Sequence, residues 1–179
     1  MSGIRIAIPV VWLVFWVYWL ISAAGAKKAV GGRVRPPGLI IIVLVGAALR
    51  VFHTGGYAVH STVAQVIGAV VFAAGLALAV WARLYLGRNW GMPMTHKEEP
   101  ELVTSGPYRF VRHPIYSGIL LGMVGTALAT NLWWLIAFLM TGAYFVHSAR
   151  VEEGIMAKTF PDAYPSYRMQ TKMIIPFVL

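Results

Sequence analysis

Long apolar runs constrain this chain more than any other feature of its sequence. The runs at residues 4–24 and 62–86 are each long enough to cross, as a helix, the roughly 30 Å hydrocarbon core of a bilayer. Three shorter apolar runs lie at residues 38–52, 115–129 and 132–146. Because 59% of the 179 residues are hydrophobic and only 12% are charged, the composition excludes an ordinary soluble domain. The sequence therefore predicts an all-α integral membrane protein with about five transmembrane helices.

Basic residues lie mainly between these runs, as in the loop that holds Lys27, Lys28, Arg33 and Arg35. Loops rich in Lys and Arg face the cytoplasm, so we expect the amino terminus outside and the carboxyl terminus in the cytoplasm. The same distribution explains the formal net charge of +9 without a nucleic-acid partner, which we do not expect. The chain has no cysteine, which excludes disulfides and thiolate metal ligands, and no metal site is predicted.

Small side chains recur through residues 62–86 and would let a neighbouring helix approach closely; they are Gly68, Ala69, Ala73, Gly75 and Ala79. Arg83 lies near the end of this run. We expect its side chain to extend to the membrane interface, because a guanidinium is costly inside a bilayer.

The last two apolar runs, 115–129 and 132–146, are separated only by Thr130 and Asn131. So short a connection predicts a tight antiparallel helical hairpin. Because a hairpin returns the chain to its starting side, the segments before and after it should lie beside each other at the cytoplasmic surface.

A polar insert at residues 102–118, LVTSGPYRFVRHPIYSG, leads into this hairpin. It brings together two cations, an imidazole and two phenols, which are Arg109, Arg112, His113, Tyr108 and Tyr116. Pro114 suits the first turn of a helix, where its missing N–H would have no partner. The insert is either a juxtamembrane anchor among lipid headgroups or a ligand site, since helix N-termini favour carboxylates and phosphates.

The tail begins with charged residues that continue the last helix. Arg150 and Glu153 lie three residues apart, which alone predicts a weak ion pair on a helix surface. If the tail faces the cationic insert, Glu152 and Glu153 instead become candidate partners for the ammonium group of a ligand.

Two motifs resemble the isoprenylcysteine carboxyl methyltransferase family and its phospholipid methyltransferase relatives. The first is GPY followed by RHPxYxG in the insert, and the second is EEGIMAKTFPDAYPSY with IPF near the end of the chain. The resemblance covers about residues 85–179. This sequence departs from the family at Pro161, which replaces a glycine, and at Ser148, where the family has a substrate-side arginine; the nearest arginine here is Arg150.

The resemblance implies a cytoplasmic pocket for S-adenosylmethionine at the end of the hairpin. The implied cofactor-binding residues are Leu102, Val103, Tyr108, His113, Pro114, Ile115, Tyr116 and a glutamate, for which the spacing from Phe160 favours Glu152 over Glu153. The cations expected to orient the acceptor are Arg150, Arg109 and Arg112. The chain would form one membrane domain over 1–179, with three spans in 1–86 and the methyltransferase core in 87–179.

The implied function is S-adenosylmethionine-dependent methylation of a lipid or lipophilic small molecule at the membrane surface, among membrane lipids. O-methylation of a carboxylate, as in isoprenylcysteine, is the first interpretation, and an ionised carboxylate needs no general base. N-methylation of a phospholipid amine is the alternative. A membrane lipid reductase and a non-enzymatic lipid-binding protein are the remaining ones.

Overall fold

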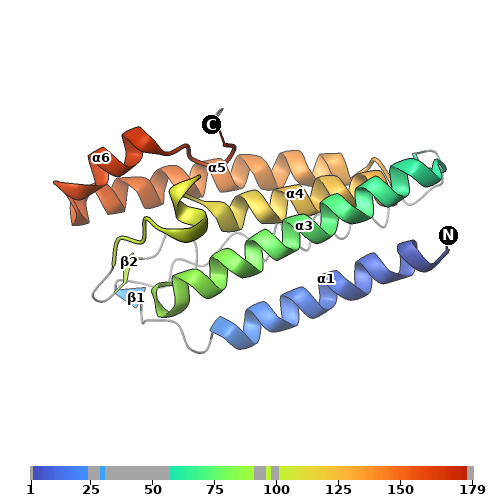
Figure 1. Ribbon diagram of the computed structural model, residues 1–179, viewed down its shortest axis with the longest axis horizontal. Coiled ribbons are helices and arrows are strands. Elements are labelled where there is room, and N and C mark those ends of the chain that lie inside the picture. The colour runs from blue at the N-terminus through green and yellow to red at the C-terminus, as the bar shows by residue number, and fades with distance from the viewer. Residues whose placement is uncertain (1, 24–28, 31–56, 91–95, 98–100, 177–179) are drawn as a thin grey trace.

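The computed structural model describes residues 2–23, 29–30, 57–90, 96–97 and 101–176, which form a bundle of long helices (Figure 1). The helices are α1 Ser2–Ala23, α3 Thr62–Leu86, α4 Pro114–Ala129, α5 Trp134–Thr159 and the short α6 Ala163–Gln170. Two 3₁₀ turns, η1 Gly87–Asn89 and η2 Gly106–Arg109, and one antiparallel pair of two-residue strands, β1 Ala29–Val30 and β2 His96–Lys97, complete the described elements. Apart from this strand pair, the regular elements of the described residues are all helical, as the sequence predicts.

Three of the described helices are long and apolar enough to cross a membrane: Gly3–Ser22 within α1, all of α3 and all of α5. The first two match the runs predicted at 4–24 and 62–86. α4 is apolar but has only 16 residues. α5 reaches 26 residues because the charged residues at the start of the tail continue the last apolar run as one helix, as the sequence predicts. The span expected at 38–52 lies outside the described residues.

α3 and α4 pack closely because glycines of each helix face the backbone of the other. A Cβ atom added at Gly68 or Gly75 of α3 would overlap the backbone of α4. One added at Gly118 or Gly125 of α4 would overlap the backbone of α3. The prediction that small residues in 62–86 bring a neighbouring helix close is confirmed, and such close packing is a main source of helix association in a bilayer.

α1 lies against α3 and α4 with one face (Figure 1). Its buried residues Ile8, Trp12, Phe15 and Trp19 recur every three or four positions, which places them on one side of the helix. The indole N–H of Trp12 donates to Thr126 Oγ1 of α4 at 3.0 Å. The other side of α1 exposes large apolar side chains, which suits contact with lipid.

The Arg83 side chain turns into the bundle, whereas the sequence predicts one that extends outward. Its side chain is buried and donates from Nη1 to the carbonyl of Gly87 at 2.8 Å and from Nη2 to the carbonyl of Ser22 at 2.7 Å. The guanidinium also lies 4.6 Å from the centre of the Trp90 ring. Carbonyls at helix C-termini lack partners within their helices, so one buried cation can join the ends of α1 and α3.

Candidate active site

The polar insert and the tail run side by side at the start of α4. Val111 and Lys172 form a parallel bridge. The backbone N–H of Arg112 donates to the carbonyl of Lys172 at 2.8 Å, and that of His113 donates to the carbonyl of Met173 at 3.0 Å. The predicted neighbourhood of insert and tail is confirmed. These backbone bonds fix the residues that precede α4 against a segment about 60 residues later in the sequence.

α4 begins at Pro114, as predicted, with His113 at its N-cap position. The imidazole does not cap the helix but stacks on Tyr116, with ring centroids 5.4 Å apart and planes inclined by 6°. Tyr116 in turn stacks on Phe145 of α5, at 4.2 Å and 12°. A continuous stack of three rings therefore joins the N-terminus of α4 to the middle of α5.

Glu152 lies at the edge of this stack. The hydroxyl of Tyr116 donates to Glu152 Oε1 at 2.6 Å, and His113 Nδ1 lies 3.5 Å from Glu152 Oε2. The Glu152 side chain retains 26% of its surface exposed. The carboxylate is thus oriented by the protein and remains partly exposed.

Glu153 is more deeply buried and is engaged by cations of the chain itself. Its Oε1 atom lies 2.6 Å from Arg112 Nε and 3.5 Å from His113 Nε2, and its Oε2 atom lies 3.5 Å from Arg168 Nε. Arg112 also donates from Nη1 to the carbonyls of Arg168, at 3.2 Å, and Thr171. His113 Nε2 is within ion-pair distance but makes no hydrogen bond, although it is buried. Glu153 and Arg112 therefore hold the tail against the insert.

Arg109 and Arg150 do not join this cluster. Arg109 is exposed, and its guanidinium lies 4.5 Å from the centre of the Phe110 ring. Arg150 is also exposed, and within the described part of the chain it forms no ion pair with Glu153. Glu153 turns instead to Arg112, because a buried carboxylate is stabilised most by a close, equally buried guanidinium.

The remaining predicted cofactor residues are buried or half-buried. Leu102 and Val103 are half-buried, and Val103 packs against the hydrophobic core. Pro114 and Ile115 are buried at the start of α4. Tyr108 is buried as well; its hydroxyl donates to the carbonyl of Ala82 at 3.4 Å, and its own carbonyl accepts from the Tyr167 hydroxyl at 2.7 Å. Burial raises the pKa of Tyr108, so its phenol remains neutral.

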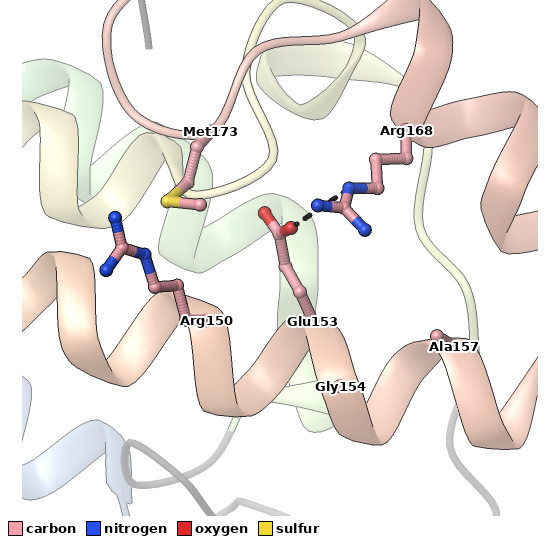
Figure 2. A pocket seen from close by; sticks show the side chains of 6 residues that line it. All are labelled: Arg150, Glu153, Gly154, Ala157, Arg168 and Met173. Atoms are coloured by element: carbon pink, nitrogen blue, oxygen red, sulfur yellow. Dashed lines mark ion pairs between the residues drawn. The ribbon is translucent and has the colours of Figure 1, made fainter.

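An open pocket of about 450 Å³ lies next to Glu153, and its lining residues are Arg150, Glu153, Gly154, Ala157, Arg168 and Met173 (Figure 2). The four α5 residues share one face, since Glu153, Gly154 and Ala157 lie three, four and seven positions after Arg150. Arg168 comes from α6, and Met173 comes from the part of the tail that follows α6. The pocket thus adjoins the ion pairs that hold insert and tail together.

Sequence reasoning missed two residues of this region. Phe145 lies two helical turns before Glu152, so the helical period alone places both on one face of α5. Arg168 follows Tyr167 in the tail, and its approach to Glu153 depends on how α6 folds back, which no local spacing indicates. Among the described residues, no group of three or more His, Asp or Glu side chains forms a metal site.

Comparison with known proteins finds a match over residues 63–163 to the phospholipid methyltransferase family model. The chain is 31% identical over 94 residues to the nickel-cobalt-cadmium resistance protein NccN of Alcaligenes xylosoxydans xylosoxydans. This matched segment covers 51% of this chain and 44% of that protein. It is 28% identical over 116 residues to a probable protein-S-isoprenylcysteine O-methyltransferase of Oryza sativa subsp. indica, covering 63% and 61%. It is 32% identical over 79 residues to the methanethiol S-methyltransferase of Pseudomonas sp. (strain GM41(2012)), covering 44% and 30%.

The matched segments cover no more than 61% of these curated relatives. The family match takes in more than half of this chain, including nearly all of α3, the insert, α4, α5 and both glutamates. The chain therefore belongs to the phospholipid methyltransferase family.

Proposed function

We propose that this protein is an S-adenosylmethionine-dependent methyltransferase of the membrane surface, which O-methylates the carboxylate of an isoprenylcysteine-like or other lipophilic acceptor. The observation that carries the proposal is the Glu152 carboxylate, which Tyr116 and His113 orient at the start of α4, inside the family match. The names of the rice and Pseudomonas relatives support methyl transfer and differ in the acceptor. The acceptor is therefore argued from the site.

The residues around Glu152 suit the cofactor. A partly exposed carboxylate can pair with the ammonium group of the cofactor's amino-acid part. The His113 side chain does not cap the first turn of α4. Backbone N–H groups of this turn can therefore donate to the carboxylate of the cofactor. His113 Nε2, which lies 3.5 Å from Glu153 Oε1 but makes no hydrogen bond, offers a further polar contact, and Leu102 and Val103 offer apolar surface to an adenine. When bound, S-adenosylmethionine supplies an electrophilic methyl group on its sulfonium.

A carboxylate acceptor fits the groups that the chain provides. Because an ionised carboxylate is already nucleophilic, the protein has to align it and exclude water rather than remove a proton. The pocket next to Glu153 presents two guanidinium groups, from Arg150 and Arg168, which suit a carboxylate. The stacked rings of Tyr116 and Phe145 place an apolar surface next to Glu152, which would help to exclude water from the reaction.

An amine acceptor is the alternative, and the name of the matching family supports keeping it in the tests. A phospholipid ammonium group has to lose a proton before it is methylated, so a nearby residue would have to accept that proton. Glu153 is the carboxylate in the pocket, but its 2.6 Å contact with Arg112 disfavours protonation. This contact favours the carboxylate acceptor over the amine.

We also propose the placement of this site in the membrane. The chain would form one membrane domain of about five spans, with its amino terminus outside and the cofactor pocket at the cytoplasmic surface. The distribution of Lys and Arg supports this orientation. The short connection at residues 130–133 supports a hairpin of α4 and α5 that returns the chain to the cytoplasmic side.

Equilibrium binding of S-adenosylhomocysteine to the purified protein in detergent tests the proposal. We expect saturable binding, and 5′-methylthioadenosine, which lacks the amino-acid part, should bind at least about 10-fold more weakly because it has no ammonium group for Glu152. A lipid reductase or a cofactor-free lipid-binding protein would bind neither compound. Absence of binding by the wild-type protein would therefore refute the proposed function.

A further inference from the structure

The pocket between α5, α6 and the tail carries more positive than negative charge. Two of its lining side chains are guanidinium groups, from Arg150 and Arg168, and one is a carboxylate, from Glu153. Figure 2 shows the two arginines on opposite sides of Glu153. The charge of Glu153 is already balanced by Arg112 at 2.6 Å. A ligand in this pocket therefore meets a surface that favours anions.

We infer that Arg150 and Arg168 together hold the anionic group of the methyl acceptor, and that Arg168 determines the preference for an anion. This inference rests on the proposed function and deepens it. Arg168 lies beyond the residues 63–163 that match the family, so neither the family match nor the motifs assign it a role. A planar guanidinium with five donors matches the two oxygens of a carboxylate.

Arg168 is held loosely enough to change partner. Its Nε atom lies 3.5 Å from Glu153 Oε2, and 61% of its side chain is exposed. An exposed ion pair at that distance contributes little to stability. If Arg168 turns to an acceptor, Glu153 keeps its contact with Arg112, whose side chain is only 9% exposed. The exchange leaves no buried charge without a partner.

The two arginines of the insert are committed elsewhere. Arg112 is occupied by Glu153 and by backbone carbonyls of the tail. Arg109 lies over the Phe110 ring, outside the pocket. Within the described residues, the guanidinium groups that line the pocket are those of Arg150 and Arg168.

The rest of the lining leaves room for an acceptor with an apolar part. A Cβ atom added at Gly154 would meet nothing within 4 Å, so the α5 wall is open beside Arg150. Ala157 adds only a methyl group to that wall. Met173 supplies a flexible apolar side chain opposite it (Figure 2). An acceptor can thus place its anion between the arginines and the start of its tail against Met173.

Paired probes that differ only in charge test the role of Arg168. N-acetyl-S-farnesylcysteine and its carboxamide are titrated against the purified full-length protein in detergent, with and without S-adenosylhomocysteine. We expect the wild type to prefer the carboxylate by about 10-fold, the loss typical of one charge-assisted hydrogen bond. Arg168→Gln should lower this preference to about 2-fold. Lys158→Gln, which removes an exposed cation of α5 outside the pocket, should keep it.

Arg150→Gln provides a second variant and should lower the same preference, so the test does not depend on one protein being well folded. Equal binding of the two probes by the wild type, or binding of neither, would overturn the inference, as would a full preference in Arg168→Gln, whatever the result for Arg150→Gln. S-adenosylhomocysteine affinity tests the proposed function separately. We expect it to stay within about 2-fold of wild type in Arg168→Gln. A wild type that binds this cofactor product but does not discriminate between the probes would refute only the inference.

Discussion

Exchanging the two adjacent glutamates for glutamine should separate cofactor binding from the stability of the fold. Glu152→Gln keeps the size of the side chain. It also keeps a hydrogen-bond acceptor for the Tyr116 hydroxyl, which in the wild type donates to Glu152 Oε1 at 2.6 Å. It removes the negative charge that we assign to the ligand ammonium. A charge-assisted hydrogen bond contributes about 1.5–3 kcal/mol, and 26% exposure lowers that to about 1–2 kcal/mol. S-adenosylhomocysteine affinity should therefore fall roughly 5- to 30-fold.

Glu153→Gln should act mainly on stability. The Glu153 side chain is 5% exposed and the Arg112 side chain 9%, so the substitution leaves a buried guanidinium without its charged partner. Removing one partner of a buried ion pair costs about 3–5 kcal/mol. Arg112 keeps its bonds to two tail carbonyls, and the new amide oxygen can still accept, so we expect about 2–3 kcal/mol. Cofactor-product affinity should fall less than about 3-fold.

Two measurements on the same detergent preparations decide the matter: thermal unfolding, and isothermal titration with S-adenosylhomocysteine. Asp162→Asn is the matched control, because it makes the same carboxylate-to-amide exchange at an exposed residue whose side chain makes no capping hydrogen bond to α6. It should change neither quantity. The reasoning is refuted if Glu152→Gln binds as tightly as wild type, or if both glutamate variants lose the same affinity and the same stability.

Two further predictions concern the bundle and its orientation. Gly125→Ala should destabilise the protein by more than about 2 kcal/mol in thermal unfolding, since the added Cβ would overlap the α3 backbone. Gly154→Ala, whose Cβ would point into open space, should be neutral or slightly stabilising in the same assay. Because the chain has no cysteine, single cysteines at Ser105 and Asn131 can be labelled without background; the proposed hairpin requires Ser105 to react from the cytoplasmic side and Asn131 from the outside, and labelling from one face would refute it.

Much of the bundle could be predicted from the sequence because lipid imposes simple rules on a chain. A spanning helix needs a long apolar run, which sets the bounds of α3, and close helices need small residues, which gives Gly68 and Gly75. The start of α4 follows from Pro114, whose ring suits only the first turn. These signals are local, and they require no knowledge of the neighbouring helices.

Parts of the site could not be predicted because they depend on long-range packing. The sequence suggests a surface position for both Arg83 and Arg150. Arg150 is exposed, but Arg83 is buried where the ends of α1 and α3 meet. Spacing could not rank Glu152 and Glu153 by burial, because adjacent helix residues differ only in which neighbour they face. The structure makes that difference clear: one carboxylate meets the Tyr116 hydroxyl and the other is enclosed by arginines.

Methyl transfer itself tests the central claim most directly. Purified protein in lipid is incubated with S-adenosylmethionine labelled in its methyl group and with either N-acetyl-S-farnesylcysteine or phosphatidylethanolamine, and the products are treated with mild alkali. A carboxyl methyl ester releases its label as volatile methanol, whereas an N-methyl amine keeps it. We predict alkali-volatile label with the farnesylcysteine probe, at a rate reduced in Glu152→Gln. Label that stays non-volatile and appears only with the phospholipid would contradict the carboxylate acceptor, and no transfer to either would contradict methylation of an isoprenylcysteine-like acceptor.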